Sequence, residues 1–236
     1  PTGSSYSDET VKRFANLKPA AEDFRIFWDN AYCIHHLYDD IQDEILNILT
    51  EGEKAGNPDM VYIFASTSKI SFPGSGVSAV ASSKANIDFI ESQMTIQTIG
   101  HDKINQLRHS RFFKDINGLK AHMKLHAKIL KPKFDAVIET LNSDLAGLGI
   151  AEWNEPNGGY FISLDVTGGS ASRVGVLCKE AGVTLTNVGA TFPYGKDPSD
   201  SNIRIAPTFP TPAVLSKAVK VLTTSVRYAC LENLLK

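Results

Sequence analysis

The sequence predicts an α/β fold in which helices cover a mainly parallel sheet and a smaller α+β domain follows. Two short apolar stretches, 22–28 and 60–66, are rich in β-branched and aromatic residues, which is typical of buried strands. Residues 39–49 between them have helical spacing. Strand–helix–strand alternation of this kind favours parallel strands. With 236 residues, 42% of them apolar, the chain can form one large domain or two ordinary ones.

The other elements follow from local signals. In the first half they are a turn at Pro1-Thr2-Gly3, a helix over 9–15 with Ser7 as its N-cap, a loop over 51–58 and a third strand over 76–82. Residues 102–148 have a helical pattern that Pro132 is expected to bend, and a helix this long commonly bridges two domains. In the second half the expected elements are a turn over 156–159, a strand over 160–165, a helix over 171–181, short strands over 183–185 and 202–206, and a final helix that opens at Pro212.

Bulk properties exclude several functions. The 24 basic and 26 acidic residues give a net charge of −2, so neither nucleic acid nor an anionic membrane is an expected partner. No apolar run approaches the ~20 residues of a spanning helix. The three cysteines, Cys33, Cys178 and Cys230, have no metal-ligand spacing, and we expect free thiols in a cytoplasmic protein. His122 and His126 have i, i+4 spacing but lack an acidic third ligand, so no metal site is expected.

A lysine and an acid follow the two predicted strands. Lys69 comes just after the strand over 60–66, and Asp29 with Tyr32 follows the strand over 22–28. Ligands collect at the carboxyl ends of parallel strands. A lysine amine forms a Schiff base with an aldehyde when its surroundings lower its pKa, and we expect the strand end to bury Lys69 partly. The alternative is a solvated surface lysine.

The neighbouring side chains suit an aldehyde cofactor that carries a pyridine ring and a phosphate. The carboxylate of Asp29 can keep a pyridinium nitrogen protonated, and the hydroxyl of Tyr32 can donate to a ring oxygen. The hydroxyls of Ser66 and Ser68 can bind a phosphate. The alternatives are a helix cap at Asp29, core packing of Tyr32 and ordinary loop hydrogen bonds from the serines.

One arginine in the second half is a candidate ligand for a substrate. Arg204 lies in a short apolar strand, where a guanidinium needs a partner or an exposed face. Its planar fork suits bidentate binding of a carboxylate. An ordinary salt bridge is the alternative.

The order of these motifs resembles that of the fold-type I pyridoxal-phosphate aminotransferases of class I/II. The motifs are Pro1-Thr2-Gly3, Asp29-Asn30-Ala31-Tyr32, Ser66-Thr67-Ser68-Lys69, Asn157-Gly158-Gly159-Tyr160-Phe161 and Arg204. The segment Phe72-Pro73-Gly74-Ser75-Gly76-Val77 is most similar to the MocR-like subgroup, which contains aspartate aminotransferases.

The resemblance implies a role for each residue. Lys69 carries pyridoxal 5'-phosphate as a Schiff base and shuttles protons, Asp29 pairs with the ring nitrogen, and Tyr32 bonds the ring oxygen. Ser66 and Ser68 hold the phosphate, and Arg204 binds the α-carboxylate. The substrates are then an amino acid, aspartate or a similar one, and a 2-oxo acid, and the protein is a homodimer.

The resemblance also implies a domain division. Residues 1–115 are the C-terminal part of the large cofactor-binding domain, residues 116–236 are the small C-terminal domain, and a long helix joins them. Two departures stand out. Val77 occupies a position where many members carry a phosphate-binding arginine, and the sequence begins just after the place of a cofactor-binding asparagine. We therefore expect a further N-terminal part of the same protein.

Two other functions remain open. One is a non-catalytic pyridoxal-phosphate-binding effector domain of a MocR-like transcription regulator, which an upstream helix-turn-helix would indicate. The other is a lyase or decarboxylase that uses the same lysine and needs no 2-oxo acid acceptor.

Overall fold

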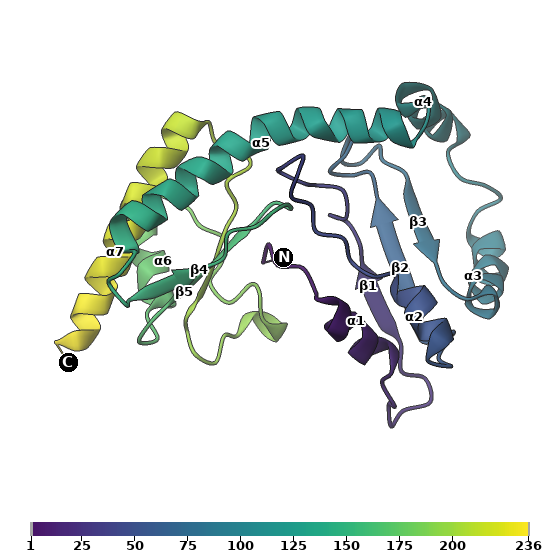
Figure 1. Ribbon diagram of the computed structural model, residues 1–236, viewed down its shortest axis with the longest axis horizontal. Coiled ribbons are helices and arrows are strands. Elements are labelled where there is room, and N and C mark those ends of the chain that lie inside the picture. The colour runs from purple at the N-terminus through teal and green to yellow at the C-terminus, as the bar shows by residue number, and fades with distance from the viewer. Residues whose placement is uncertain (1, 236) are drawn as a thin grey trace. The chain divides into compact units, whose positions relative to one another are not determined.

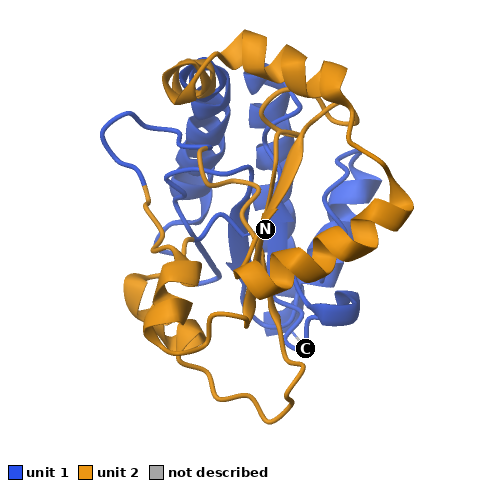
Figure 2. Ribbon diagram, turned by 90° about the vertical axis from the view of Figure 1, so that its right-hand side faces the viewer, with its two compact units in different colours: residues 1–4, 35–42, 124–236 blue, residues 5–34, 43–123 orange. Residues whose placement is uncertain are grey.

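The computed structural model describes residues 2–235 of the chain (Figure 1). Its contacts divide it into two compact units (Figure 2). The lysine-loop unit comprises residues 5–34 and 43–123. The C-terminal unit comprises residues 1–4, 35–42 and 124–236. The predicted domains, 1–115 and 116–236, stay a prediction. No helix among the described residues is both long enough and apolar enough to cross a membrane.

The lysine-loop unit contains a three-stranded mixed sheet in the order β1-β2-β3. β1 (Ile26–Asp29) runs parallel to β2 (Val61–Ser66), and β3 (Ser78–Ala81) pairs with β2 in the antiparallel direction. All three strands were predicted from the sequence. β1 begins four residues later than predicted because the chain turns at Ala21, whose carbonyl accepts from the N–H of Phe24.

The helices of this unit begin at side chains that cap them. α1 (Asp8–Ala15), α2 (Ile48–Lys54), α3 (Lys84–Gln97) and α4 (Lys103–Phe113) follow Ser7, Asn47, Ser83 and Asp102, respectively. Each of these side chains accepts from a backbone N–H of the first turn, which would otherwise lack a partner. The small core of the unit consists of Val11, Ile48, Met60 and Val61.

The helix predicted over 39–49 is wrong. Residues 41–47 are irregular, and the helix is α2, which begins after Asn47. Asn47 decides the position because its Oδ1 accepts from the N–H groups of Leu49 and Thr50. Gly52, expected beyond the end of the helix, lies buried inside α2.

The single helix predicted over 102–148 is two helices, α4 and α5 (Ile116–Leu145). Lys114 adopts a φ of +64°, which ends α4, and Asp115 Oδ1 accepts from the N–H of Asn117 and of Gly118 at the start of α5. α5 continues through Pro132. The sequence analysis did not predict α3.

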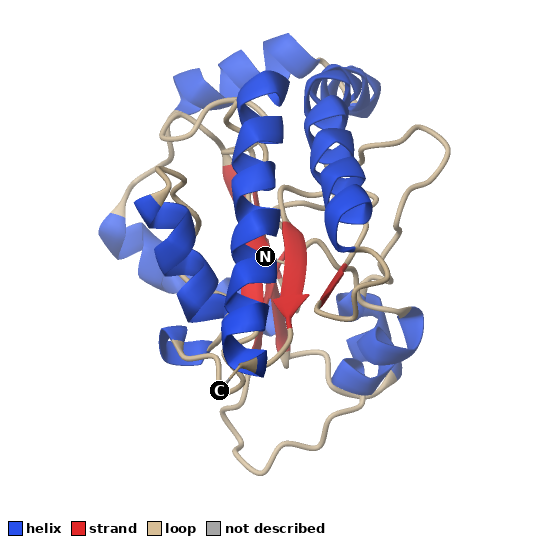
Figure 3. Cartoon of the chain, turned by 90° about the vertical axis from the view of Figure 1, so that its left-hand side faces the viewer, coloured by secondary structure: helices blue, strands red, loops and turns tan. Residues whose placement is uncertain are grey.

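The C-terminal unit packs helices onto an antiparallel sheet (Figure 3). The strands are β4 (Ala151–Trp153), β5 (Ile162–Val166) and β6 (Asn202–Ile205), and the helices are α5, α6 (Ala171–Glu180), α7 (Pro212–Leu234) and the short 3₁₀-helix η1 (Pro193–Gly195). Ile162, Leu164 and Val166 alternate with less buried residues, so one face of β5 lies in the core. β5, α6, β6 and α7 confirm the prediction.

The strand predicted over 183–185 is not present; these residues are irregular. The N–H of Val183 instead donates to the carbonyl of Cys178 in α6, which ties the chain to the end of that helix. The three cysteines are free thiols, as expected.

A segment from early in the chain completes the C-terminal unit. His36 forms a bridge with Gly158, the N–H of Leu37 donates to the carbonyl of Asn157, and Leu37 enters the core. A Cβ atom at Gly158 would lie 2.5 Å from the carbonyl oxygen of His35, so the close approach needs glycine.

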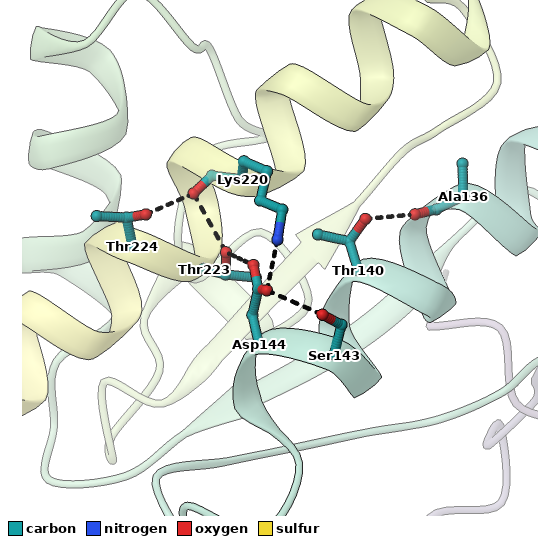
Figure 4. A network of polar contacts seen from close by, with 7 residues as sticks. All are labelled: Ala136, Thr140, Ser143, Asp144, Lys220, Thr223 and Thr224. Carbon is teal, nitrogen blue, oxygen red and sulfur yellow. Dashed lines mark hydrogen bonds and ion pairs between the residues drawn. The ribbon is translucent and has the colours of Figure 1, made fainter.

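A polar network fastens α5 to α7 (Figure 4). Asp144, near the end of α5, accepts from Lys220 Nζ at 2.5 Å and from Thr223 Oγ1 at 2.7 Å. The hydrogen bond from Lys220, with the second from Thr223, holds the pKa of Asp144 below its usual value.

Candidate functional site

The carboxyl ends of β1 and β2 lie at the same edge of the sheet. The strands are parallel, with Asp29 paired in register with Phe64, and Asn30 N–H extends the ladder to the carbonyl of Phe64. Asp29 is the last residue of β1 and Ser66 the last of β2. The parallel register therefore brings together the two motifs that the sequence placed forty residues apart.

Asp29 and Tyr32 form the first part of the candidate site. Asp29 is exposed, and its Oδ1 accepts from the N–H of Ala31 at 3.1 Å, which fixes the carboxylate at the start of a turn. No helix follows, so Asp29 is not a helix cap. Tyr32 lies in that turn, half-buried, with Lys69 Nζ 5.2 Å from the centre of its ring. The turn therefore places the ring of Tyr32 close to the amine of Lys69.

Lys69 lies in a closed hairpin loop, residues 67–77, which we call the lysine loop. The loop joins β2 to β3, and its neck is closed by two hydrogen bonds of 2.8 Å, from Thr67 N–H to the carbonyl of Val77 and from Val77 N–H to Thr67 Oγ1. Lys69 itself is exposed, not partly buried as expected, while the next residue, Ile70, is buried.

A histidine from α4 contacts the lysine loop on both sides of Lys69. His109 Nε2 lies 2.7 Å from Ser71 Oγ and 3.2 Å from Thr67 Oγ1. Its Nδ1 lies 2.8 Å from the carbonyl oxygen of Asn105, which can only accept, so Nδ1 carries the proton. In the neutral ring Nε2 then accepts from the loop hydroxyls.

A second histidine contacts the same loop. His122 Nε2, from α5, lies 2.8 Å from the carbonyl oxygen of Ile70 and must be the donor. The sequence analysis considered His122 only as a metal ligand and did not single out His109. Within the described residues no cluster of three or more histidine, cysteine or acidic side chains could hold a metal ion.

Ser66 and Ser68 flank Thr67, whose hydroxyl contacts His109 and accepts from the N–H of Val77. Across residues 2–235, neither serine hydroxyl takes part in a hydrogen bond with another protein group. Both side chains are half-buried beside Lys69 in the sequence. They are suited to donate to an anionic group near the amine.

Arg204 belongs to β6 of the C-terminal unit, where it pairs in register with Ser163. Its guanidinium carbon lies 4.6 Å from the centre of the Phe161 ring, which stacks the fork against an apolar surface. Its Nε is buried without a hydrogen-bond partner among the described residues. Arg204 also lines a cavity of about 320 Å³ beside Leu185 and Leu215. A buried donor beside a cavity suits an anionic ligand.

Together, the residues near β1 and β2 fit pyridoxal phosphate. The group needs an amine for its aldehyde, an anion for its ring nitrogen and donors for its phosphate. Lys69, Asp29 and the hydroxyls of Ser66 and Ser68 offer such groups at adjacent strand ends.

Solved structures show the class of this fold. The chain superposes on an aspartate transaminase from Corynebacterium glutamicum with a TM-score of 0.95 and 45% identity, over 98% of this chain and 55% of the other. LysN, an α-aminoadipate aminotransferase from Thermus thermophilus solved with N-(5'-phosphopyridoxyl)-L-leucine, shares the fold at a TM-score of 0.77 and 17% identity, over 98% of this chain and 57% of its own. The fold is that of the fold-type I aminotransferases, as the sequence predicted.

The family follows from the sequence as a whole. The family model described as aspartate amino-transferase matches residues 1–236, and the chain belongs to this family. A curated aspartate aminotransferase from Corynebacterium glutamicum is 45% identical over 233 residues, which are 99% of this chain and 54% of the relative. The chain thus spans about half the length of the curated relatives it matches.

Proposed function

We propose that this protein is a pyridoxal-phosphate-dependent aminotransferase that transfers an amino group between an amino acid and a 2-oxo acid. The observation that carries the proposal is Lys69, which stands exposed in a closed hairpin loop, 5.2 Å from the ring of Tyr32 and at the sheet edge where Asp29 ends β1. The relatives named above are described as aminotransferases. This favours an enzyme over the effector domain of a regulator.

Bound pyridoxal phosphate supplies an aldehyde that condenses with an amine, with loss of water, and a ring that takes up electrons. Lys69 would provide the amine, and its nitrogen would also accept and return a proton during the reaction. Asp29 keeps the ring nitrogen protonated. Tyr32 donates to the ring oxygen, and the hydroxyls of Ser66 and Ser68 donate to the phosphate.

Arg204 binds the substrate carboxylate in this proposal. Its buried Nε has no acceptor among the described residues, and its guanidinium lies over the ring of Phe161. A carboxylate accepts two parallel hydrogen bonds from such a fork.

The substrate and the assembly are finer parts of the proposal. The C. glutamicum relatives are named for aspartate, so we propose aspartate or a similar dicarboxylic amino acid as the donor. We also propose a homodimer, which the family resemblance implies.

Borohydride reduction of the full-length protein with pyridoxal phosphate, followed by peptide mass mapping, tests the cofactor assignment. We expect a pyridoxyl group on Lys69 and none on Lys84, which is exposed on α3 and serves as an internal control. A label that is absent from Lys69, or equal on both lysines, would contradict the proposal.

A further inference from the structure

We propose that His109 and His122 are positioning residues for Lys69. Their imidazoles fix the lysine loop so that the amine stays at the sheet edge beside Tyr32. This inference rests on the proposed function, because it explains why a loop with a cofactor-binding amine would be held in place. In this proposal both histidines act through the lysine loop and not on the cofactor or the substrate.

His109 ties together the two sides of the loop around Lys69. Thr67 lies two residues before the lysine and Ser71 two residues after it, and one ring nitrogen contacts both hydroxyls, at 3.2 and 2.7 Å. Ser71 Oγ also lies 3.2 Å from Thr67 Oγ1. The contacts therefore hold the two residues of chain on each side of Lys69 in one short arc.

The other nitrogen of the His109 imidazole is held by α4 itself. His109 Nδ1 donates to the carbonyl of Asn105, one turn earlier in the helix, so the ring cannot rotate without losing that bond. The side chain of Asn105 also donates to the carbonyl of Gly76 at 2.8 Å. The first two turns of α4 therefore hold both the beginning and the end of the lysine loop.

His122 adds a third attachment at the residue next to the lysine. Its Nε2 donates to the carbonyl of Ile70, whose side chain is only 7% exposed. The rings of Phe112 and Phe113 pack edge-on against His122, with centroid separations of 5.4 Å in each case. A ring enclosed in this way keeps its direction, so the Ile70 carbonyl has a fixed donor.

The attachments matter because Lys69 is exposed. An exposed side chain on an unattached loop samples many conformations, and ordering it at each encounter with a ligand costs conformational entropy. Hydrogen bonds to the backbone and hydroxyls beside the lysine remove part of that cost before the cofactor arrives.

Hydrogen exchange of the cofactor-free, full-length protein tests the attachments directly. Glutamine places its amide near the position of Nε2, whereas asparagine reaches only the position of Nδ1. We expect exchange within residues 67–77 to be about fivefold to tenfold faster in His109→Asn, as for the loss of one or two hydrogen bonds, and near wild type in His109→Gln. His101→Ala, at an exposed histidine just before α4, is the control and should change nothing in the loop.

Labelling of Lys69 tests what the attachments are for. Each variant is incubated with pyridoxal phosphate, samples taken at intervals are reduced with borohydride, and pyridoxyl incorporation at Lys69 in each sample is measured by peptide mass mapping. We expect slower incorporation in His109→Asn and in His122→Ala, and recovery in His109→Gln. Ser71→Ala removes only the nearer hydroxyl, and it supplies a milder variant if a histidine variant does not fold.

The outcomes separate this inference from the proposed function. If wild type carries no label on Lys69, the proposed function fails, whatever the variants do. If wild type is labelled and the loop exchanges at wild-type rates in His109→Asn and Ser71→Ala, the histidine does not order the loop. Faster exchange with unchanged labelling of Lys69 would also overturn the positioning role.

Discussion

At the scale of single residues, Lys69 carries the proposed chemistry. Replacing it with alanine in the full-length protein removes both the amine that binds the cofactor and the group proposed to move the proton. We expect the rate of transamination to fall by about 10³-fold, within the range of a lost general acid–base. The measurement is the rate at which bound cofactor changes its absorbance on mixing with the amino acid, with Lys84→Ala as the control that should keep full activity.

Arg204 provides a second test at this scale. Arg204→Lys keeps the charge but loses the planar fork that binds a carboxylate with two hydrogen bonds. Losing one hydrogen bond to a charged group costs about 2 kcal/mol, which is about 30-fold in kcat/KM. Arg173→Lys is the matched control, because Arg173 makes a bidentate pair with Glu232 in the same unit. Equal losses in the two variants would remove Arg204 from the substrate site.

The residues of the candidate site differ in how far the sequence could predict them. Asp29 and Lys69 could be placed at one sheet edge because each follows a recognisable apolar strand. His109 could not, because its contacts depend on the close approach of α4 to the lysine loop, and no local pattern encodes that approach. The exposure of Lys69 was also missed, since burial depends on what packs above a loop.

At the scale of elements, the network around Asp144 fastens α5 to α7. Asp144→Asn keeps the shape but loses the charge that Lys220 and Thr223 bind. We expect the free energy of unfolding of the full-length protein to fall by about 1 kcal/mol near neutral pH. Asp135→Asn is the control, because Asp135 pairs with Lys131 along the same helix with both side chains over a third exposed, and such pairs contribute about 0.3–0.5 kcal/mol.

The pH dependence of this effect has a defined sign. The pKa of Asp144 is lowered in the folded protein, so the stabilisation is present above the unfolded-state pKa of about 3.9. It is lost as the pH falls through the lower, folded-state pKa. The difference between wild type and Asp144→Asn in urea unfolding should therefore shrink below about pH 4. A difference that stays constant with pH would show that the carboxylate charge is not what joins the two helices.

Among the features of the helices and strands, the starts and ends of helices were predicted least well from the sequence. The break between α4 and α5 lies at Lys114, a residue with no breaker signal, whose φ of +64° is set by the surrounding structure. α2 begins at Ile48 and not at Asp39 because the capping amide of Asn47 outweighs the helical spacing of the residues before it. Where the local signal is strong the boundary was predicted correctly, as at Pro212, the first residue of α7.

At the scale of the whole molecule, the order of the motifs was more informative than any one of them. Five weak motifs in the right order indicated the fold class that the solved structures confirm. The sequence could not show that residues 35–42 belong with residues 124–236, because that assignment depends on contacts such as His36 with Gly158, far along the chain. It also did not predict the reversed direction of β3.

The sheet of the lysine-loop unit has a consequence for how this polypeptide behaves at high concentration. Among the described strands β1 pairs only with β2, so its other side offers unpaired N–H and C=O groups, and Phe27 beside them is 73% exposed. Such an edge is a template for foreign strands. We expect residues 1–236 produced alone to scatter light increasingly with time. Phe27→Lys should slow that growth more than Phe209→Lys, which alters a still more exposed ring in a loop. Equal slowing by both changes would mean that added charge, and not the edge of β1, governs the association. The strand that ends at Asp29 is thus also, along its unpaired side, the expected starting point for association between chains.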